Sequence, residues 1–220
     1  MSSKLTVRSG SLVTLAIIWL ICLLGHGGNL DRDLFSQIHD HGTKLIPIAD
    51  GISTLGSPLF LCVVLTVGAA LLLWLQRIRA TVVFIALVFS CRILRLMQEM
   101  TFALPRPNAS VAHVAGISPY GFPSGHAANS MATYLGLALI ISARGPWRDL
   151  AVVLALATTF AVGISRVFLG VHWPSDVMAG WSFGCFWTVS VLWANGAAWR
   201  SQLGFRSDKV PARFRDSSDY

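Results

Sequence analysis

Charged residues are scarce in this sequence. Asp, Glu, Lys and Arg make up 12% of its 220 residues, whereas soluble globular domains carry roughly 25%. Hydrophobic residues make up 54%, and the mean hydropathy is +0.63. These values argue against a soluble enzyme. Because the apolar residues extend along the whole chain, they also exclude a disordered protein and favour a single membrane domain.

Cysteine motifs are absent as well. The four cysteines lie far apart inside apolar stretches, and no C-x-x-C spacing of the kind that holds zinc or supports redox chemistry occurs. We therefore expect the cysteines to pack as small apolar side chains.

Six segments approach the length of about 20 apolar residues that a transmembrane helix needs. Their central parts are residues 12–24, 58–75, 80–97, 126–142, 150–169 and 177–199. The first segment resembles a secretory signal, but no small-x-small cleavage site follows it, so we favour an uncleaved span. The sequence predicts an all-α integral membrane protein in which residues 1–200 form a six-span domain and residues 201–220 form a polar, basic tail.

The distribution of Lys and Arg predicts the orientation of these spans. If the N-terminus is cytoplasmic, eleven Lys and Arg residues lie on the inside, and the outside loops contain only Arg32, Lys44 and Arg106. Cytoplasmic segments of membrane proteins carry such an excess. We therefore expect both termini in the cytoplasm, and the net charge of +7 needs no nucleic acid as a partner.

Two smaller features leave alternatives open. Leu34, Phe35, Ile38, Leu45 and Ile48 could form a short amphipathic helix on the membrane surface. The Gly-x-x-x-Gly pattern at residues 180–184 could be a helix contact within the bundle or a seam between two copies of the chain.

Two motifs lie at the external ends of the third and fourth spans. Pro105-Arg106-Pro107 places an arginine on a stiff backbone, and Pro123-Ser124-Gly125-His126 opens the fourth span. In the second motif, the backbone N–H groups of Ser124, Gly125 and His126 could bind an anion at the positive end of the helix dipole. The alternative for this motif is an ordinary turn with an isolated histidine.

A third motif joins the fifth and sixth spans. We expect Gly170 to end one helix and Pro174 to begin the next, with His172 in the turn and Asp176 in the first helical turn. An aspartate beside Nδ1 fixes the histidine tautomer and leaves Nε2 free to attack an electrophile.

Two arginines complete a possible site for phosphoryl transfer. Arg106 and Arg166 fall on the same side of the membrane as His172 and can neutralise phosphate oxygens. The alternative is that Arg166 only pairs with Asp176 between two spans. That alternative requires three unrelated motifs to meet at one membrane level by chance, so the catalytic interpretation is favoured.

With these motifs the sequence resembles the type 2 phosphatidic acid phosphatase superfamily, a family of membrane lipid phosphatases. The family pattern is KxxxxxxRP, PSGH and SRxxxxxHxxxD. The second motif is complete at residues 123–126, and the third is complete at residues 165–176. The resemblance covers most of the chain.

The resemblance implies a role for each matching residue. It makes His172 the nucleophile that forms a phosphohistidine, Asp176 the residue that orients it, and His126 the general acid for the leaving group. The phosphoryl group would be held by Arg106, Ser124, Gly125 and Arg166. The family implies no metal and no other cofactor.

One position departs from the family pattern. The first motif requires a lysine seven positions before Arg106, and this chain has Glu99 there. Arg95 lies one helical turn earlier on the same face, where it could pair with Glu99 or reach the substrate, and Arg92 continues the stripe. Alternatively, these three residues form only a polar network between helices.

The resemblance implies a lipid phosphatase of the bacterial inner membrane, with its active site facing the periplasm. Undecaprenyl pyrophosphate is the favoured substrate, and phosphatidate or phosphatidylglycerol phosphate are others. The alternatives are a lipid A phosphatase, a lipid-to-lipid phosphotransferase, or an impaired lipid-binding or transport protein in which Glu99 has disabled the site. Its expected partners are the lipid substrate and the bilayer, without an obligatory protein partner.

Overall fold

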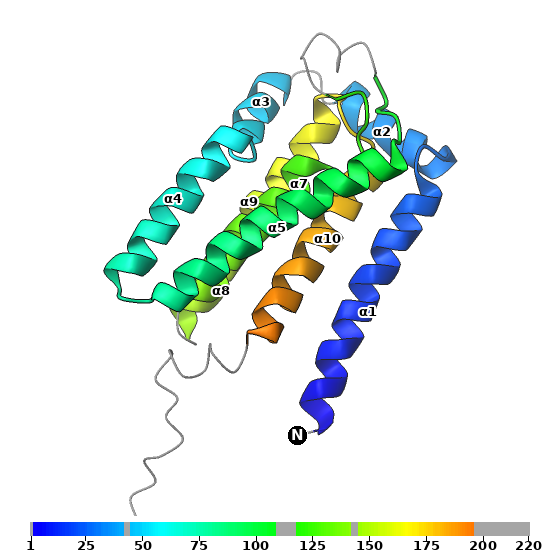
Figure 1. Cartoon of the computed structure of the whole chain (residues 1–220). Helices are drawn as coiled ribbons and strands as arrows, with labels where there is room; N and C mark the ends of the chain where they lie inside the picture. Colours follow the sequence, from blue (N-terminus) through cyan, green and yellow to red (C-terminus); the bar gives the residue numbers. More distant parts are fainter. Residues whose placement is uncertain (1, 42–44, 109–117, 142–144, 196–220) are drawn as a thin grey trace, which may run out of the picture.

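The structure is a computed structural model that describes residues 2–41, 45–108, 118–141 and 145–195. Within these residues it is helical, apart from one isolated antiparallel bridge between Pro105 and Tyr120. The helices shown in Figure 1 are α1 (Ser2–Gly25), α2 (Asn29–His41), α3 (Ile46–Thr54), α4 (Pro58–Trp74), α5 (Ile78–Phe102), α7 (Gly125–Ser130), the π-helical turn η2 (Met131–Leu135), α8 (Gly136–Ile141), α9 (Pro146–Phe168) and α10 (Pro174–Ala194). The predicted tail at residues 201–220 lies outside the described part.

Four helical segments in the described residues are long and apolar enough to cross a membrane. They are residues 46–74, which comprise α3 and α4, together with α5, α9 and α10. A fifth exists if α1 and α2 are counted together, although the chain bends by 90° between them. The remaining predicted span corresponds to α7, η2 and α8, which run within the same bundle (Figure 1). The helical membrane architecture is supported, while the number of six spans and their orientation stay predictions.

Local sequence explains where several helices begin and end. Ser57 caps α4, since its Oγ accepts a hydrogen bond of 3.3 Å from the backbone N–H of Phe60, and Pro58 follows at the first helical position. Pro174 begins α10 in the same way. Gly170, with φ of +70°, follows Leu169, the C-cap of α9, and turns the chain toward α10. The ends predicted at Gly170 and Pro174 are therefore confirmed.

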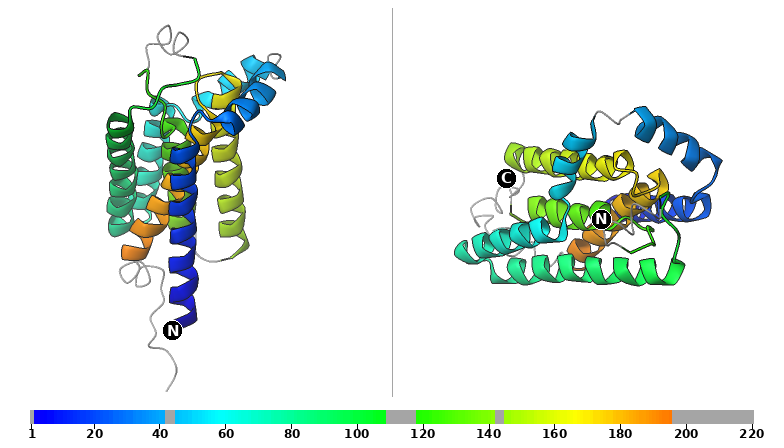
Figure 2. Two further views of the ribbon diagram at one scale, coloured as in Figure 1. Left: turned by 90° about the vertical axis from the view of Figure 1, so that its right-hand side faces the viewer. Right: turned by 90° about the horizontal axis from the view of Figure 1, so that it is seen from above.

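The centre of the bundle is formed by the segment α7–η2–α8, which contacts α5, α9 and α10. Seen from above, α7 lies between α5 and α9 (Figure 2). Two glycines allow α10 to approach closely: a Cβ at Gly180 would lie 2.7 Å from the Ser124 carbonyl oxygen, and one at Gly184 would lie 2.6 Å from that of Ala128. The Gly-x-x-x-Gly pattern is thus a packing contact within the bundle.

The first loop forms two helices rather than one amphipathic helix. α2 crosses the ends of α9 and α10, and its Phe35 and Ile38 pack against a cluster that contains Val167 and Val177. These two apolar side chains pack against protein, and a role of the loop on the membrane surface stays a prediction. The loop instead forms a cover beside the end of the bundle where the three motifs meet.

Candidate active site

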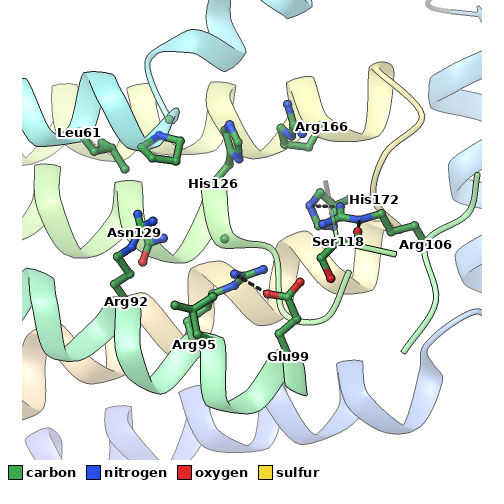
Figure 3. A pocket seen from close by; sticks show the side chains of 14 residues that line it. Leu61, Arg92, Arg95, Glu99, Arg106, Ser118, His126, Asn129, Arg166 and His172 are labelled. Atoms are coloured by element: carbon green, nitrogen blue, oxygen red, sulfur yellow. Dashed lines mark hydrogen bonds and ion pairs between the residues drawn. The ribbon is translucent and has the colours of Figure 1, made fainter. Parts of the chain in front are cut away.

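The three sequence motifs meet at one end of the bundle, around a cavity of about 270 Å³. The end of α5, the segment after it, the start of α7, the end of α9 and the turn before α10 all contribute (Figure 3). The charged and polar side chains lining the cavity include Arg92, Arg95, Glu99, Arg106, His126, Asn129, Arg166 and His172. The structure therefore brings together residues that are up to 80 positions apart in the sequence.

His172 and Asp176 form a buried pair at the start of α10. His172 lies in the turn between α9 and α10, and its Nδ1 is 3.1 Å from Asp176 Oδ2. The same carboxylate oxygen accepts a hydrogen bond of 3.0 Å from the backbone N–H of Trp173, so it also caps the helix. These contacts fix both the aspartate and the imidazole that it orients, as the sequence predicted.

Arg106 identifies the tautomer of His172. Its Nη1 lies 2.8 Å from His172 Nε2 and 2.9 Å from the Val171 carbonyl oxygen, and its Nε donates to the Ser118 carbonyl oxygen at 2.8 Å. A guanidinium can only donate, so Nε2 is the accepting nitrogen and carries the lone pair. Nδ1 then carries the proton and donates it to Asp176. This is the form of histidine that can attack an electrophile.

The surroundings of His172 keep the imidazole neutral. Burial, together with the nearby Arg106 and Arg166, lowers its pKa to about 3, although the hydrogen bond with Asp176 opposes the shift. Burial lowers the pKa of Arg106 as well, but a guanidinium remains protonated in proteins. At neutral pH the site therefore combines a neutral nucleophile with a cation.

Residues from the first loop reach the same carboxylate and helix. His26 Nε2 lies 3.1 Å from Asp176 Oδ1, on the opposite side from His172. Asp31 accepts hydrogen bonds from the backbone N–H and Oγ of Ser175, at 2.9 and 2.6 Å. Neither residue belongs to a sequence motif, because no fixed spacing links the first loop to the third motif.

Gly121 is another residue that the motifs did not indicate. A Cβ at this position would lie 2.8 Å from Asp176 Oδ2 and 3.1 Å from Arg106 Cγ. Any larger residue would therefore displace the carboxylate or the arginine. This glycine lets the chain before α7 cross directly over the His172–Asp176 pair.

The PSGH motif differs from its expected arrangement in two ways. α7 begins at Gly125, so Pro123 precedes the helix instead of occupying its first turn. The backbone N–H of Ser124 donates to the Asp176 carbonyl oxygen at 2.9 Å, and it is not available to a ligand as predicted. The Ser124 Oγ is buried and has no hydrogen-bond partner in the described residues. Gly125 and His126 do line the cavity.

Arg166 does not pair with Asp176. Its Nη1 donates to Ser53 Oγ at 2.5 Å, while its Nε is buried without a hydrogen-bond partner in the described part of the chain. The alternative interpretation of a simple ion pair between two spans is therefore wrong. Arg166 lines the cavity, and its Nε–H remains available to donate a hydrogen bond.

Glu99, at the position of the family lysine, is neutralised by Arg95. Arg95 Nη1 lies 2.6 Å from Glu99 Oε2, and its Nε donates to the Pro123 carbonyl oxygen at 3.1 Å. A Cβ at Gly125 would lie 2.9 Å from Arg95 Cζ, so the guanidinium lies against the start of α7 (Figure 3). The pairing of Arg95 with Glu99 is thus confirmed, and both residues also line the cavity.

Curated relatives of the chain include three bacterial or archaeal proteins. It is 28% identical to phosphatidylglycerophosphatase B of Bacillus subtilis over 142 residues, which are 62% of this chain and 68% of the relative. It is 40% identical to undecaprenyl-diphosphatase of Sulfolobus acidocaldarius over 65 residues, 30% of this chain and 29% of the relative. It is also 40% identical to lipid A 4'-phosphatase of Bacteroides thetaiotaomicron over 67 residues, 30% of this chain and 28% of the relative.

Two solved structures share the fold. One is the transmembrane PAP2-type phosphatidylglycerolphosphate phosphatase from Bacillus subtilis, with a TM-score of 0.75, 24% identity, and 85% of this chain and 96% of that chain covered. The other is LpxE from Aquifex aeolicus, with a TM-score of 0.58, 21% identity, and 76% and 96% covered. The sequence model of the PAP2 superfamily matches residues 80–200, more than half of the chain. This protein therefore belongs to the PAP2 superfamily, the type 2 phosphatidic acid phosphatases that its motifs resemble.

Proposed function

We propose that this membrane protein hydrolyses a lipid phosphate or lipid pyrophosphate through a phosphohistidine on His172. The observation that carries the proposal is the state of this side chain: Asp176 holds Nδ1, while the Nε2 lone pair lies beside Arg106 in the cavity. The matched relatives, which are named for three different lipid phosphates, support the same substrate class.

In the first step, Nε2 of His172 attacks the phosphorus, and the bond between phosphorus and the leaving oxygen breaks. Arg106 moves its Nη1 donor from Nε2 to a phosphate oxygen, and Arg166 supplies its unused Nε–H to another. His126 gives a proton to the leaving oxygen. Asp176 stabilises the positive charge that forms on the imidazole ring.

In the second step, water attacks the phosphohistidine. His126 now accepts a proton from this water, the nitrogen–phosphorus bond breaks, and inorganic phosphate leaves. The net reaction is hydrolysis of one phosphate bond, with His172 restored to its neutral form. No step uses a metal ion or another cofactor.

The lipid can reach this site from the bilayer between α4 and α5. These helices are joined at the far end of the bundle and diverge toward the cavity (Figure 1), and Leu61 of α4 and Leu96 of α5 line its wall. A hydrocarbon chain can therefore stay in the membrane while its phosphate enters. Undecaprenyl pyrophosphate is the first candidate substrate, and phosphatidate or phosphatidylglycerol phosphate are the next.

The asymmetry of Lys and Arg supports the location. Both termini are proposed to be cytoplasmic, which places the cavity on the periplasmic side of the bacterial inner membrane. Accessibility of a cysteine introduced at Ser118 to a membrane-impermeant thiol reagent in intact cells tests this orientation. Labelling only after the membrane is opened would reverse it.

Phosphate release by purified protein in detergent tests the activity. We expect release from undecaprenyl pyrophosphate or phosphatidate with EDTA present, and a loss of about 10⁴-fold or more in His172→Ala. His39→Ala is the matched control, because this imidazole bonds to the Phe168 carbonyl oxygen and does not line the cavity. Release that stops with EDTA, or that survives in His172→Ala, would contradict the mechanism.

The alternatives predict different products. An obligatory phosphotransferase releases no free phosphate without an acceptor lipid, and a lipid A phosphatase, which the Bacteroides thetaiotaomicron relative favours, prefers that lipid. An impaired lipid-binding protein forms no phosphohistidine. A donor lipid with a radiolabelled phosphate distinguishes all three from the proposed hydrolase. The measured quantities are the labelled products and the acid-labile label on the protein.

A further inference from the structure

A row of charge extends from the proposed site into the membrane. Arg92, Arg95 and Glu99 share one face of α5, and Arg92 lies about 4.5 Å deeper along the helix axis than Arg95. Arg95 is paired with Glu99, but the Arg92 guanidinium has no hydrogen-bond or ion-pair partner in the described residues. Unpaired charge on a membrane helix is costly and usually marks the path of a ligand.

The facing helix carries a second unpartnered group at the same depth. Asn129 lies one turn after His126 on α7, and its Oδ1 is buried without a hydrogen-bond partner in the part of the chain that the structure describes. α7 begins at the end of the bundle where α5 finishes. Asn129 lies one turn deeper than His126 on α7, and Arg92 lies one turn deeper than Arg95 on α5, so Asn129 and Arg92 lie beside each other (Figure 3). Both residues line the same cavity as His172.

We propose that Arg92, Arg95 and Asn129 form a second phosphate subsite, which makes a lipid diphosphate the preferred substrate. This inference rests on the proposed phosphatase function and specifies its substrate class. The terminal phosphate lies at His172, the ester phosphate lies between α5 and α7, and the hydrocarbon chain leaves between α4 and α5. The arginines of α5 then compensate for the missing family lysine by binding the other phosphate.

This arrangement also assists the departure of the lipid. As the bond from Nε2 to the terminal phosphorus forms, the bond from that phosphorus to the bridging oxygen breaks. The electron pair of that bond stays on the bridging oxygen, so the leaving group is the lipid monophosphate with one added negative charge. Arg92 neutralises this charge, and Arg95, whose own charge is paired with Glu99, donates a further hydrogen bond. A phosphate ester with a second pKa near 6 needs no proton to leave. Water then hydrolyses the phosphohistidine.

A matched pair of substrates tests the subsite. Geranylgeranyl diphosphate and geranylgeranyl monophosphate differ by one phosphate, and the measured quantity is the ratio of their kcat/KM values. In Arg92→Gln we expect this ratio to fall about 10- to 100-fold, since one charge-assisted contact to the ester phosphate is lost. Arg79→Gln, an exposed arginine near the start of the same helix, should leave the ratio unchanged.

A second variant tests the facing helix. Asn129→Asp sets a carboxylate against the ester phosphate, so the ratio should fall again. The subsite is overturned if folded Arg92→Gln keeps the wild-type ratio of kcat/KM values. This outcome means that the substitution affects both substrates equally or affects neither. Failure of the wild-type protein to hydrolyse either substrate would instead contradict the proposed function, so the two failures are distinguishable.

Discussion

The two walls of the cavity differ in how completely their polar groups are bonded. On the wall formed by the turn before α10, His172 contacts Asp176 and Arg106, and the carboxylate also contacts Trp173 and His26. On the wall formed by α5 and α7, several polar atoms lack hydrogen-bond partners within the described residues. They are the guanidinium of Arg92 and Asn129 Oδ1.

This difference suits two separate tasks, which are orienting the nucleophile and binding the substrate. A nucleophile must be held in one orientation and one tautomer before the substrate arrives, and the contacts of His172 with Asp176 and Arg106 provide both. A binding surface must keep donors free, because each donor already used inside the protein has to be released first. Under the proposed function, the wall that contains His172 acts on the phosphate and the wall that contains Arg92 and Asn129 receives the rest of the lipid.

The largest expected effect comes from breaking the bonded wall at Asp176. In Asp176→Asn the side-chain amide can donate to Nδ1 of His172, which moves the proton to Nε2 and removes the attacking lone pair. We expect kcat to fall about 10³- to 10⁴-fold, measured as phosphate release in detergent. Asp33→Asn, an exposed aspartate on α2, is the control, and a loss below tenfold would refute the assigned tautomer.

Replacing His126, the proposed general acid, should have an effect that depends on the substrate. In His126→Ala we expect a loss of about 10²- to 10⁴-fold on geranylgeranyl monophosphate, whose alkoxide must be protonated as it leaves. The loss on the diphosphate should be smaller, because a phosphate leaves without a proton. Equal losses on the two substrates would exclude His126 as the proton donor.

Replacing His26, which lies beside Asp176, should have an intermediate effect on kcat. His26→Ala removes one of the two imidazoles beside Asp176, so we expect kcat to fall about tenfold with little change in KM. His26→Gln can still donate to Oδ1 and should restore most of the rate. If the glutamine variant is as slow as the alanine variant, the ring is needed for packing against Phe122 rather than for orienting the carboxylate.

The smallest expected effect is the contribution of His172 to the pH dependence of the protein's thermal stability. The folded protein holds the pKa of His172 at about 3, below its ordinary value of 6.5, so the unfolded chain takes up a proton that the folded chain excludes. The stabilisation is complete above about pH 6.5 and is lost progressively as the pH falls toward 3. We expect the Tm in detergent to fall by a few degrees more between pH 7 and pH 5 in wild type than in His172→Gln. An equal decrease in both would show that other groups dominate.

Local rules predicted much of this structure. The helix ends at Gly170 and Pro174 follow from backbone preferences, and the Arg95–Glu99 pair follows from a spacing of four residues on one helix. The His172–Asp176 pair lies across a single turn and was predicted for the same reason. Each of these contacts joins residues that are close in the sequence.

Contacts between distant segments could not be predicted in this way. Nothing in the spacing of the motifs indicates that His26 touches Asp176, or that residue 121 must be a glycine beside the same carboxylate. The Ser124 N–H was expected to be free, yet the fold directs it to the Asp176 carbonyl oxygen. Such contacts depend on how whole helices pack, and hydrophobic patterns do not specify that arrangement.

The contact between His26 and Asp176 has a consequence for the order in which the protein is made. The ribosome synthesises His26 at the end of the first helix, about 150 residues before the carboxylate that it meets. During insertion into the membrane, this imidazole waits unpaired until the last helix is released and packs beside the first. The complete arrangement around Asp176 therefore forms only once α10 has packed beside α1, and a protein truncated before α10 lacks the carboxylate that His26 meets.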